Sequence, residues 1–271
     1  TFRDDRTPIN RNNRGFSLTL GTDTDHDIDF GAGACWDSTE AFFFSVAAMT
    51  KQADAVWAVG SAAGGMDISV SAGFVMAVSD VTYAYAIRKD SDATGDIVFS
   101  LSSNWAGVDK THISGYTYGR RIGAVPTDAS RNWVGFTEFE GDYEFDSTQL
   151  QISVASTTAT IAYTLFTAPS LPAKALGRGG AVGTAGSNAC SALAGGVAGA
   201  GASGTALAVS SAAFYSNDVS VDTTRMAGSW AARADGSQQL CYARTHVSVS
   251  QTVTLLVSLK GYSLINRFAE V

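Results

Sequence analysis

Short runs in which apolar and polar residues alternate recur along the chain, and they predict β-strands. From Phe16 to Leu20 every second residue is apolar, and Ile28 and Phe30 continue the pattern. Turn residues such as Asp235 and Gly236 separate the runs at short intervals. Comparable runs lie at 81–89, 96–103, 132–139, 150–156, 159–166, 205–214, 241–250 and 252–265. This pattern predicts an all-β, mainly antiparallel fold of the sandwich, barrel or jelly-roll kind.

One segment has helical rather than strand periodicity. Ala53, Val56 and Trp57 are apolar at positions i, i+3 and i+4, and Thr50 is a good residue to cap the start of a helix. Gly60 suits the left-handed position that ends a helix. We therefore expect one short helix at about 50–59.

Composition divides the chain near residue 148. Aromatic and charged residues are frequent before that point, whereas Ala, Ser, Gly and Thr dominate after it. The division predicts a β-rich domain with one helix at 1–148 and a jelly-roll-like β-sandwich at 149–271. Within the second part, the glycine-rich stretch 177–186 predicts a flexible loop, because the helix and the GK[ST] sequence of a phosphate-binding loop are missing.

Charge and hydropathy exclude two classes of partner. The net charge is −7 and no run of Lys or Arg is present, so nucleic acid is not expected as a partner. Hydrophobic residues make up 45% of the chain, which suffices for a large core. The longest uncharged stretch, 179–217, is interrupted throughout by Gly, Ser, Thr and Asn, so membrane insertion is not expected either.

Cysteine and histidine supply no recognisable metal or redox motif. Cys35, Cys190 and Cys241 are widely separated and odd in number, which argues against a disulfide framework and indicates folding in a reducing cytoplasm. Cys190 and Cys241 form a pair in one interpretation, and all three are small buried hydrophobic residues in the other. The three histidines form no HExxH or HxH arrangement. We expect no cofactor.

Aspartates occupy every second position from 23 to 29. Such spacing is typical of a Ca²⁺ loop, but an EF-hand needs glycine at position 6 and glutamate at position 12. Counting from Asp23 or from Asp25, neither residue is in place. The other interpretation is a turn followed by a strand, with Asp27 and Asp29 toward solvent and Ile28 and Phe30 toward the core.

A second acidic cluster spans residues 138–146. Glycosidases use two carboxylates that flank the scissile bond. Glu138, Glu140 and Asp142 are therefore candidates for a polysaccharide-cleaving site. The alternative is a solvated hairpin that turns at Gly141 and Asp142.

Five aromatic and basic residues are candidates for contact with a partner or receptor. Aromatic rings stack on sugars, and arginines bind anionic groups. The alternative is that the rings belong to the core and the two arginines form an exposed basic pair. These candidates are Trp105, Tyr116, Tyr118, Arg120 and Arg121.

Four sequence blocks resemble, in the same order, a family of tail-fibre-like virion proteins of tailed bacteriophages. They read HDIDFGAGACWDST (26–39), MTKQADAVWAVGSAAGGMDIS (49–69), AIRKDSDATGDIVFS (86–100) and GYTYGRRIG (115–123). A closing TVTLLVSLKGYSLINR (252–267) also resembles the family. The chain departs from the family pattern at Trp36, at the Phe42-Phe43-Phe44 run and in the Gly/Ala-rich region 177–204.

The resemblance implies a non-enzymatic component of a phage particle, such as a tail fibre, a spike or a head-associated fibre, with attachment and oligomerisation as the role of residues 1–148. Appendages of this kind are usually homotrimers, so the expected partners are further copies of the chain, other tail or capsid proteins, and a host-surface glycan or protein. The expected location is the virion, after assembly in the host cytoplasm. A polysaccharide-cleaving tailspike and a cellular lectin or adhesin remain as alternatives.

Overall fold

The protein consists of two compact β units, and the second begins at Asp142. The computed structural model describes residues 14–67 and 81–139 and, between 142 and 264, the residues of eight strands. Side chains are described as far as residue 146. The second unit thus begins close to residue 148, where the composition of the sequence changes.

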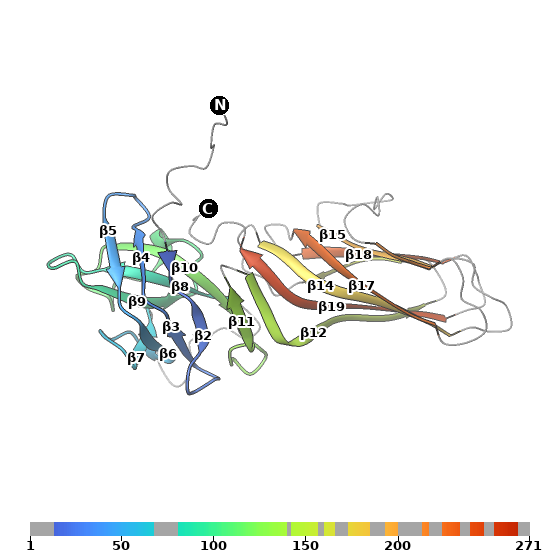
Figure 1. The fold of residues 1–271 in the computed structure, drawn as a ribbon, viewed down its shortest axis with the longest axis horizontal. Helices are drawn as coiled ribbons and strands as arrows, with labels where there is room; N and C mark the ends of the chain where they lie inside the picture. The colour runs from blue at the N-terminus through green and yellow to red at the C-terminus, as the bar shows by residue number, and fades with distance from the viewer. Residues whose placement is uncertain are drawn as a thin grey trace, which may run out of the picture. The chain divides into compact units, whose positions relative to one another are not determined.

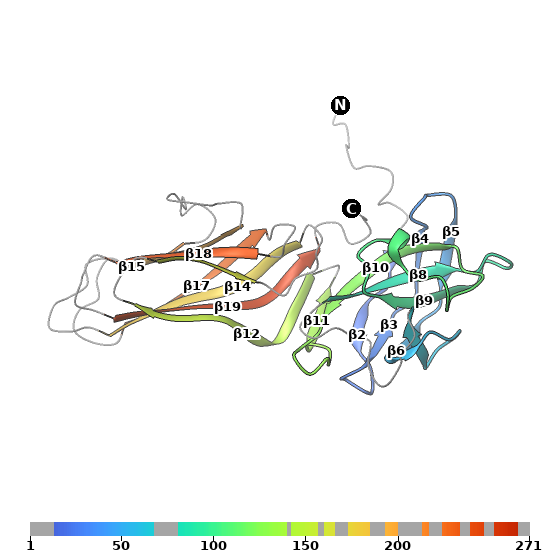
Figure 2. The ribbon, with the colours of Figure 1, turned by 180° about the vertical axis from the view of Figure 1, so that it is seen from behind.

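The first unit is built on a sheet that curls into a half-barrel (Figure 2). Its strands lie in the order β10-β8-β9-β7-β6-β3-β2, and a smaller sheet has the order β1-β4-β5. Pairing is antiparallel except where β7 pairs with β6 and with β9. The elements are β1 (Arg14–Gly15), β2 (Leu18–Leu20), β3 (Asp27–Phe30), β4 (Gly33–Trp36), β5 (Phe43–Val46), β6 (Met49–Val56), β7 (Ala63–Met66), β8 (Val81–Arg88), β9 (Gly95–Ser100), the short 3₁₀ turn η2 (Trp105–Gly107), β10 (Tyr118–Pro126) and β11 (Phe136–Phe139).

Apolar residues of β2 and β3 are buried as predicted, whereas β8, β9 and β10 are buried on both faces. Phe16, Leu18, Ile28 and Phe30 are buried, as the sequence pattern predicts. The prediction that Asp27 faces solvent is wrong, because its side chain is 8% exposed. This burial raises the pKa of the Asp27 carboxyl.

The helix predicted at about 50–59 is wrong, because residues 49–56 form strand β6. β6 pairs with β3 on one side and with β7 on the other. Lys51 and Ala53 are both fully buried, so the inward side of the strand carries a lysine. A charged residue at an inward position conceals the two-residue period, and the remaining apolar residues then match a helical spacing.

The second unit is a jelly roll. Its strands are β12 (Asp142–Ser156), β13 (Thr160–Leu165), β14 (Ala173–Thr184), β15 (Leu193–Gly199), β16 (Ala213–Ser216), β17 (Thr224–Arg233), β18 (Gln239–His246) and β19 (Thr252–Leu264). Hydrogen-bonded neighbours follow the orders β12-β19-β14-β17 and β13-β18-β15-β16, and every pair is antiparallel.

The two sheets of this unit form the layers seen in Figure 1 and face each other through β14 and β17 on one side and β15 and β16 on the other. Counted from β12 as the first strand, the orders are 1-8-3-6 and 2-7-4-5. Successive strands therefore alternate between the sheets, except that β15 and β16 are neighbours in one sheet, as in the double Greek key of the jelly roll. The predicted all-β fold with a jelly-roll sandwich is confirmed.

Two further sequence predictions concern the same unit. The loop predicted at 177–186 is wrong over residues 177–184, which belong to β14 and bond to β17 and β19. Ladders on both sides outweigh the weak strand propensity of glycine. Cys190 lies outside the described residues, whereas Cys35 is a buried free thiol whose pKa burial raises to about 12. None of the helical segments described is long and apolar enough to cross a membrane.

Candidate functional site

The turn that joins β4 to β5 is organised by a buried carboxylate, that of Asp37. Its Oδ1 accepts a hydrogen bond from the Phe42 backbone N–H at 2.6 Å, and its Oδ2 accepts one from the Thr39 N–H at 3.0 Å and another from the Thr39 hydroxyl. Burial alone would raise the pKa of Asp37, but these hydrogen bonds together lower it. The ionised carboxylate therefore fixes the shape of the turn and the place of Phe42.

Arg120 holds this turn against strand β10. Its Nε donates to the Trp36 carbonyl at 2.8 Å, and its Nη2 donates to the Asp37 carbonyl. A backbone hydrogen bond of 2.8 Å from the Ser38 N–H to the Gly119 carbonyl adds a third link. Because Arg120 is buried, these bonds act away from water and place the turn firmly beside β10.

The docked turn brings Phe42 onto two side chains at the ends of β8 and β10. Arg88 and Tyr118 are directly opposite each other in the antiparallel pair. The rings of Phe42 and Tyr118 have centroids 4.5 Å apart, and the guanidinium carbon of Arg88 lies 4.5 Å from the Phe42 ring and 5.8 Å from the Tyr118 ring. We call Phe42, Arg88 and Tyr118 the Arg88 cluster.

The Arg88 cluster is partly exposed to solvent, and the guanidinium N–H groups of Arg88 have no hydrogen-bond acceptor among the described residues. Phe42 is 37% exposed, and Arg88 and Tyr118 are half-buried. In the described part of the chain, Arg88 makes its side-chain contacts with the two rings and has no carboxylate partner. A guanidinium presents five N–H donors in a planar fork that matches carboxylate and phosphate. The cluster can therefore receive an anionic group beside an aromatic face.

A second ring pair lies at the next position along the chain. Trp36 and Phe43 are cross-strand partners in β4 and β5, and their ring centroids are 5.5 Å apart. Phe43 is 45% exposed. The β4–β5 hairpin thus carries exposed aromatic surface at two successive residues, Phe42 and Phe43.

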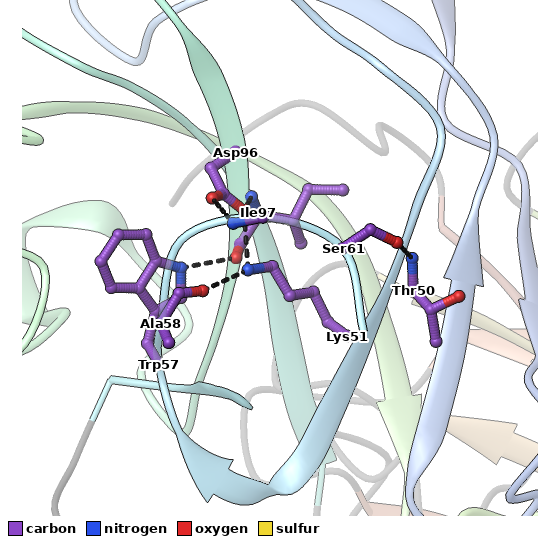
Figure 3. Close-up of polar contacts among 8 residues, drawn as sticks. Thr50, Lys51, Trp57, Ala58, Ser61, Asp96 and Ile97 are labelled. Carbon is purple, nitrogen blue, oxygen red and sulfur yellow. Dashed lines mark hydrogen bonds and ion pairs between the residues drawn. The ribbon is translucent and has the colours of Figure 1, made fainter. Parts of the chain in front are cut away.

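A different cation, Lys51, is buried inside the same unit, and its ammonium group contacts other residues of that unit (Figure 3). Its Nζ lies 2.8 Å from Asp96 Oδ1, donates to the Ala58 carbonyl at 2.7 Å, and sits 5.3 Å from the centre of the Trp57 ring. Asp96 Oδ2 also accepts the Gly60 N–H at 2.8 Å. Burial lowers the pKa of Lys51, and the contact with Asp96 opposes that shift. This buried group ties the loop after β6 to β9.

Four of the five predicted contact residues are buried. Trp105, Tyr116, Arg120 and Arg121 are at most 7% exposed, and Tyr118 alone belongs to the exposed cluster. The Trp105 Nε1–H donates to the Thr117 carbonyl at 3.0 Å. The Trp105 and Tyr116 rings are core aromatics, as the alternative interpretation holds, whereas the Tyr118 ring is not.

The exposed basic pair that this alternative also contained is wrong. Arg121 is 1% exposed, and its Nη1 donates to the Ser103 carbonyl at 2.9 Å, while Arg120 bonds the carbonyls of Trp36 and Asp37. Carbonyls from segments that come close only in the folded state accept hydrogen bonds from both guanidinium groups.

The acidic candidates Glu138 and Asp142 lie at the end of β11 and at the start of β12. Glu138 Oε2 accepts the Leu18 backbone N–H at 3.3 Å, Glu140 lies outside the described residues, and Asp142 begins β12. In the aspartate ladder, Asp23 accepts from the Asp25 N–H at 3.1 Å and lies 3.0 Å from His26 Nδ1. The side chains that the structure describes contain no group of His, Cys, Asp and Glu arranged to hold a metal ion.

Phe42 and Arg88 were missed as candidates from the sequence, although one signal was present. Residues 42–44 are three consecutive phenylalanines, and the two-residue period of a strand cannot bury all of them on one side. The structure buries Phe44 and exposes the other two. The sequence around Arg88 gives no such signal, because the two rings that contact Arg88 belong to two other segments of the chain.

The four blocks that carry the family resemblance contact one another in the first unit. Arg120, in the fourth block, donates to the carbonyl of Asp37 in the first block. Lys51, in the second block, pairs with Asp96 in the third. The Thr117 N–H donates to Asp90 Oδ1 at 3.0 Å and joins the fourth block to the third. In comparison with known proteins, the chain matches no protein-family model and no curated sequence.

Proposed function

We propose that this protein is a non-enzymatic structural component of a tailed-bacteriophage particle, in a tail fibre, spike or head-associated fibre that serves attachment or adhesion to the host surface. The observation that carries the proposal is the strand order of the second unit, β12-β19-β14-β17 over β13-β18-β15-β16. Jelly rolls of this order are used by viral capsid and lectin domains. It follows, in the same chain, a unit made of the four blocks that resemble phage fibre proteins.

The chemistry of the first unit supports a binding rather than a catalytic role. The buried polar groups Asp37, Lys51, Asp96 and Arg120 are occupied by hydrogen bonds or ion pairs that hold loops in place. The Arg88 cluster, in contrast, turns its rings and cation outward. A rigid scaffold with an exposed binding surface is the arrangement expected of an adhesion module.

Adhesion by such a module relies on repetition. A site of three side chains binds weakly, but several copies on one particle raise the overall affinity by about 10²–10⁴. We therefore expect a homotrimer that is anchored to other virion proteins.

The proposal is tested by mass spectrometry and sedimentation. Purified particles should contain the protein at a copy number that is a multiple of three, and the full chain should sediment as a trimer. A stable monomer that is missing from purified particles would refute the proposal.

A cellular lectin is the second candidate, since lectin domains share the jelly-roll order. Gene context separates the two: neighbouring portal and tail genes support the virion protein, and a secretion signal on the full gene supports the lectin. A polysaccharide-cleaving spike is favoured less, because Glu138 is occupied by the Leu18 N–H. Unchanged polysaccharide cleavage by Glu138→Gln would exclude a catalytic role for that residue.

A further inference from the structure

We infer that the Arg88 cluster is a binding site for an acidic saccharide, a uronic-acid type of sugar whose carboxylate is received by Arg88 and whose ring packs on the aromatic side chains. The inference rests on the proposed adhesion function and adds to it the class of ligand and the residues that bind it.

The carboxylate is assigned to Arg88 because this cation has no anionic partner among the described residues. The neighbouring Lys89 lies 2.9 Å from Asp92, and Arg120 is bonded to the carbonyls of Trp36 and Asp37. Arg88 has only the two rings of its own cluster as described side-chain partners. A planar guanidinium binds a carboxylate through two parallel N–H···O bonds, so the open donors fit this group in shape and charge.

The aromatic residues indicate that the ligand is a sugar that carries a carboxylate rather than a free anion. One face of a pyranose ring consists of C–H groups and is apolar, so it packs favourably on aromatic side chains. The Phe42 ring, 37% exposed, and the half-buried Tyr118 ring both lie against Arg88. The site thus offers an apolar surface next to a cation, which are the two parts that a uronic acid needs.

The site is already in its binding arrangement. Asp37 fixes the turn that carries Phe42, Arg120 fixes this turn on β10, and stacking on Phe42 and Tyr118 orients the guanidinium. Little side-chain freedom is lost on binding, which favours a small ligand. An acidic protein partner would need about 800 Å² of surface per side, far more than this cluster of three side chains supplies.

The chain as a whole is acidic, with a net charge of −7, so it repels rather than attracts anions at long range. Binding of an acidic sugar therefore depends on local contacts at Arg88. Substitutions of Arg88 and of its contact Phe42 therefore test the inference most directly.

The experiment is a calorimetric titration of the full chain with tetragalacturonate, with its neutral methyl ester as the comparison ligand. We expect wild type to bind the acid and to bind the ester at least about tenfold more weakly, since a charge-assisted pair is lost. Arg88→Gln and Phe42→Ala should each weaken binding of the acid at least about tenfold. Arg88→Lys should fall between wild type and Arg88→Gln, because it keeps the charge without the fork. The control Lys89→Gln removes the adjacent exposed cation and should bind as wild type does.

Equal affinity for acid and ester, or unchanged binding by Arg88→Gln, would overturn the inference. Stronger binding of a poly-glutamate peptide than of tetragalacturonate would also overturn it, in favour of an acidic protein partner. The same preparations are analysed by sedimentation and particle mass spectrometry. A trimer present in particles that does not bind tetragalacturonate would refute this inference alone, whereas absence from particles would refute the proposed function.

Discussion

Lys51 and Arg88 both lie against aromatic rings in the first unit, but of these two cations only Lys51 has an anionic partner among the described residues. Lys51 is 5.3 Å from the Trp57 ring centre, fully buried, and 2.8 Å from Asp96. Arg88 is 4.5 Å from the Phe42 ring centre, half-buried, and has no carboxylate partner among the described residues. The first cation is enclosed by the fold, and the second is left open to solvent.

The difference shows how the same pair of groups serves stability in one place and binding in another. A buried charge must be compensated within the protein, and Asp96 and the Ala58 carbonyl do this for Lys51. A partly exposed guanidinium remains hydrated and costs little to leave unpaired. Arg88 can therefore keep its donors for a ligand, and substitutions at the two positions should separate stability from binding.

The largest effect is expected for Lys51→Met. Removing the lysine leaves Asp96 buried without its cation, which costs about 3–5 kcal/mol in the free energy of unfolding. Urea denaturation of the full chain measures this loss. The control is Lys89→Met, since the Lys89–Asp92 pair has nearly the same length, 2.9 Å, but its side chains are 43% and 48% exposed. Equal effects of the two substitutions would show that the Lys51–Asp96 pair does not stabilise the unit.

A smaller loss, about 2–3 kcal/mol, is expected for Arg120→Met. The substitution removes the hydrogen bonds to the Trp36 and Asp37 carbonyls and so loosens the turn that carries Phe42. Arg120→Met should lower both the unfolding free energy and the affinity for tetragalacturonate, and denaturation with calorimetry tests both. Loss of stability with unchanged affinity would show that the turn does not position the cluster.

Lowering the pH should destabilise the same turn, because it protonates the Asp37 carboxylate. Since the folded-state pKa of Asp37 lies below the ordinary value of 3.8, its contribution is complete above that value and is lost as the pH falls through the folded-state pKa. Asp37→Asn should cost about 1–2 kcal/mol at pH 7. The difference from wild type should shrink below about pH 4, in thermal melts recorded across that range. A difference that is constant with pH would contradict this role of the carboxylate.

The smallest change in stability is expected for Arg88→Gln. An exposed cation–π contact is worth about 0.5–1 kcal/mol, so the unfolding free energy should fall by less than about 1 kcal/mol even where binding is lost. Urea denaturation checks this. A loss as large as that of Lys51→Met would place Arg88 in the fold rather than in a binding site.

The sequence predicts the structure best where the inward positions of the strands are apolar. Alternating residues reveal strands whose inward positions are apolar, and they sufficed for the all-β class, but the glycine-rich part of strand β14 was predicted as a loop. The method failed at 50–59, where Lys51 occupies an inward position and its compensating anion lies on a distant strand. Thr50 there does not cap a helix but donates to Asp29 on β3.

The candidate site could be predicted only in part. Tyr118 was identified for its aromatic ring, but Arg88 becomes its neighbour only through the register of β8 and β10, and Phe42 only through the turn that Arg120 anchors. Arg120 and Arg121 resemble surface residues in the sequence because the carbonyls that bind them belong to other segments. Contacts of this kind depend on tertiary structure and leave no local pattern.

The most direct test of the account follows the side-chain Nε–H resonances of the arginines by NMR while tetragalacturonate is added. Arg120 and Arg121, buried and bonded to backbone carbonyls, serve as internal controls. We predict a saturable shift of the Arg88 resonance, with those of Arg120 and Arg121 unchanged. An Arg88 resonance that stays in place throughout the titration would contradict the account.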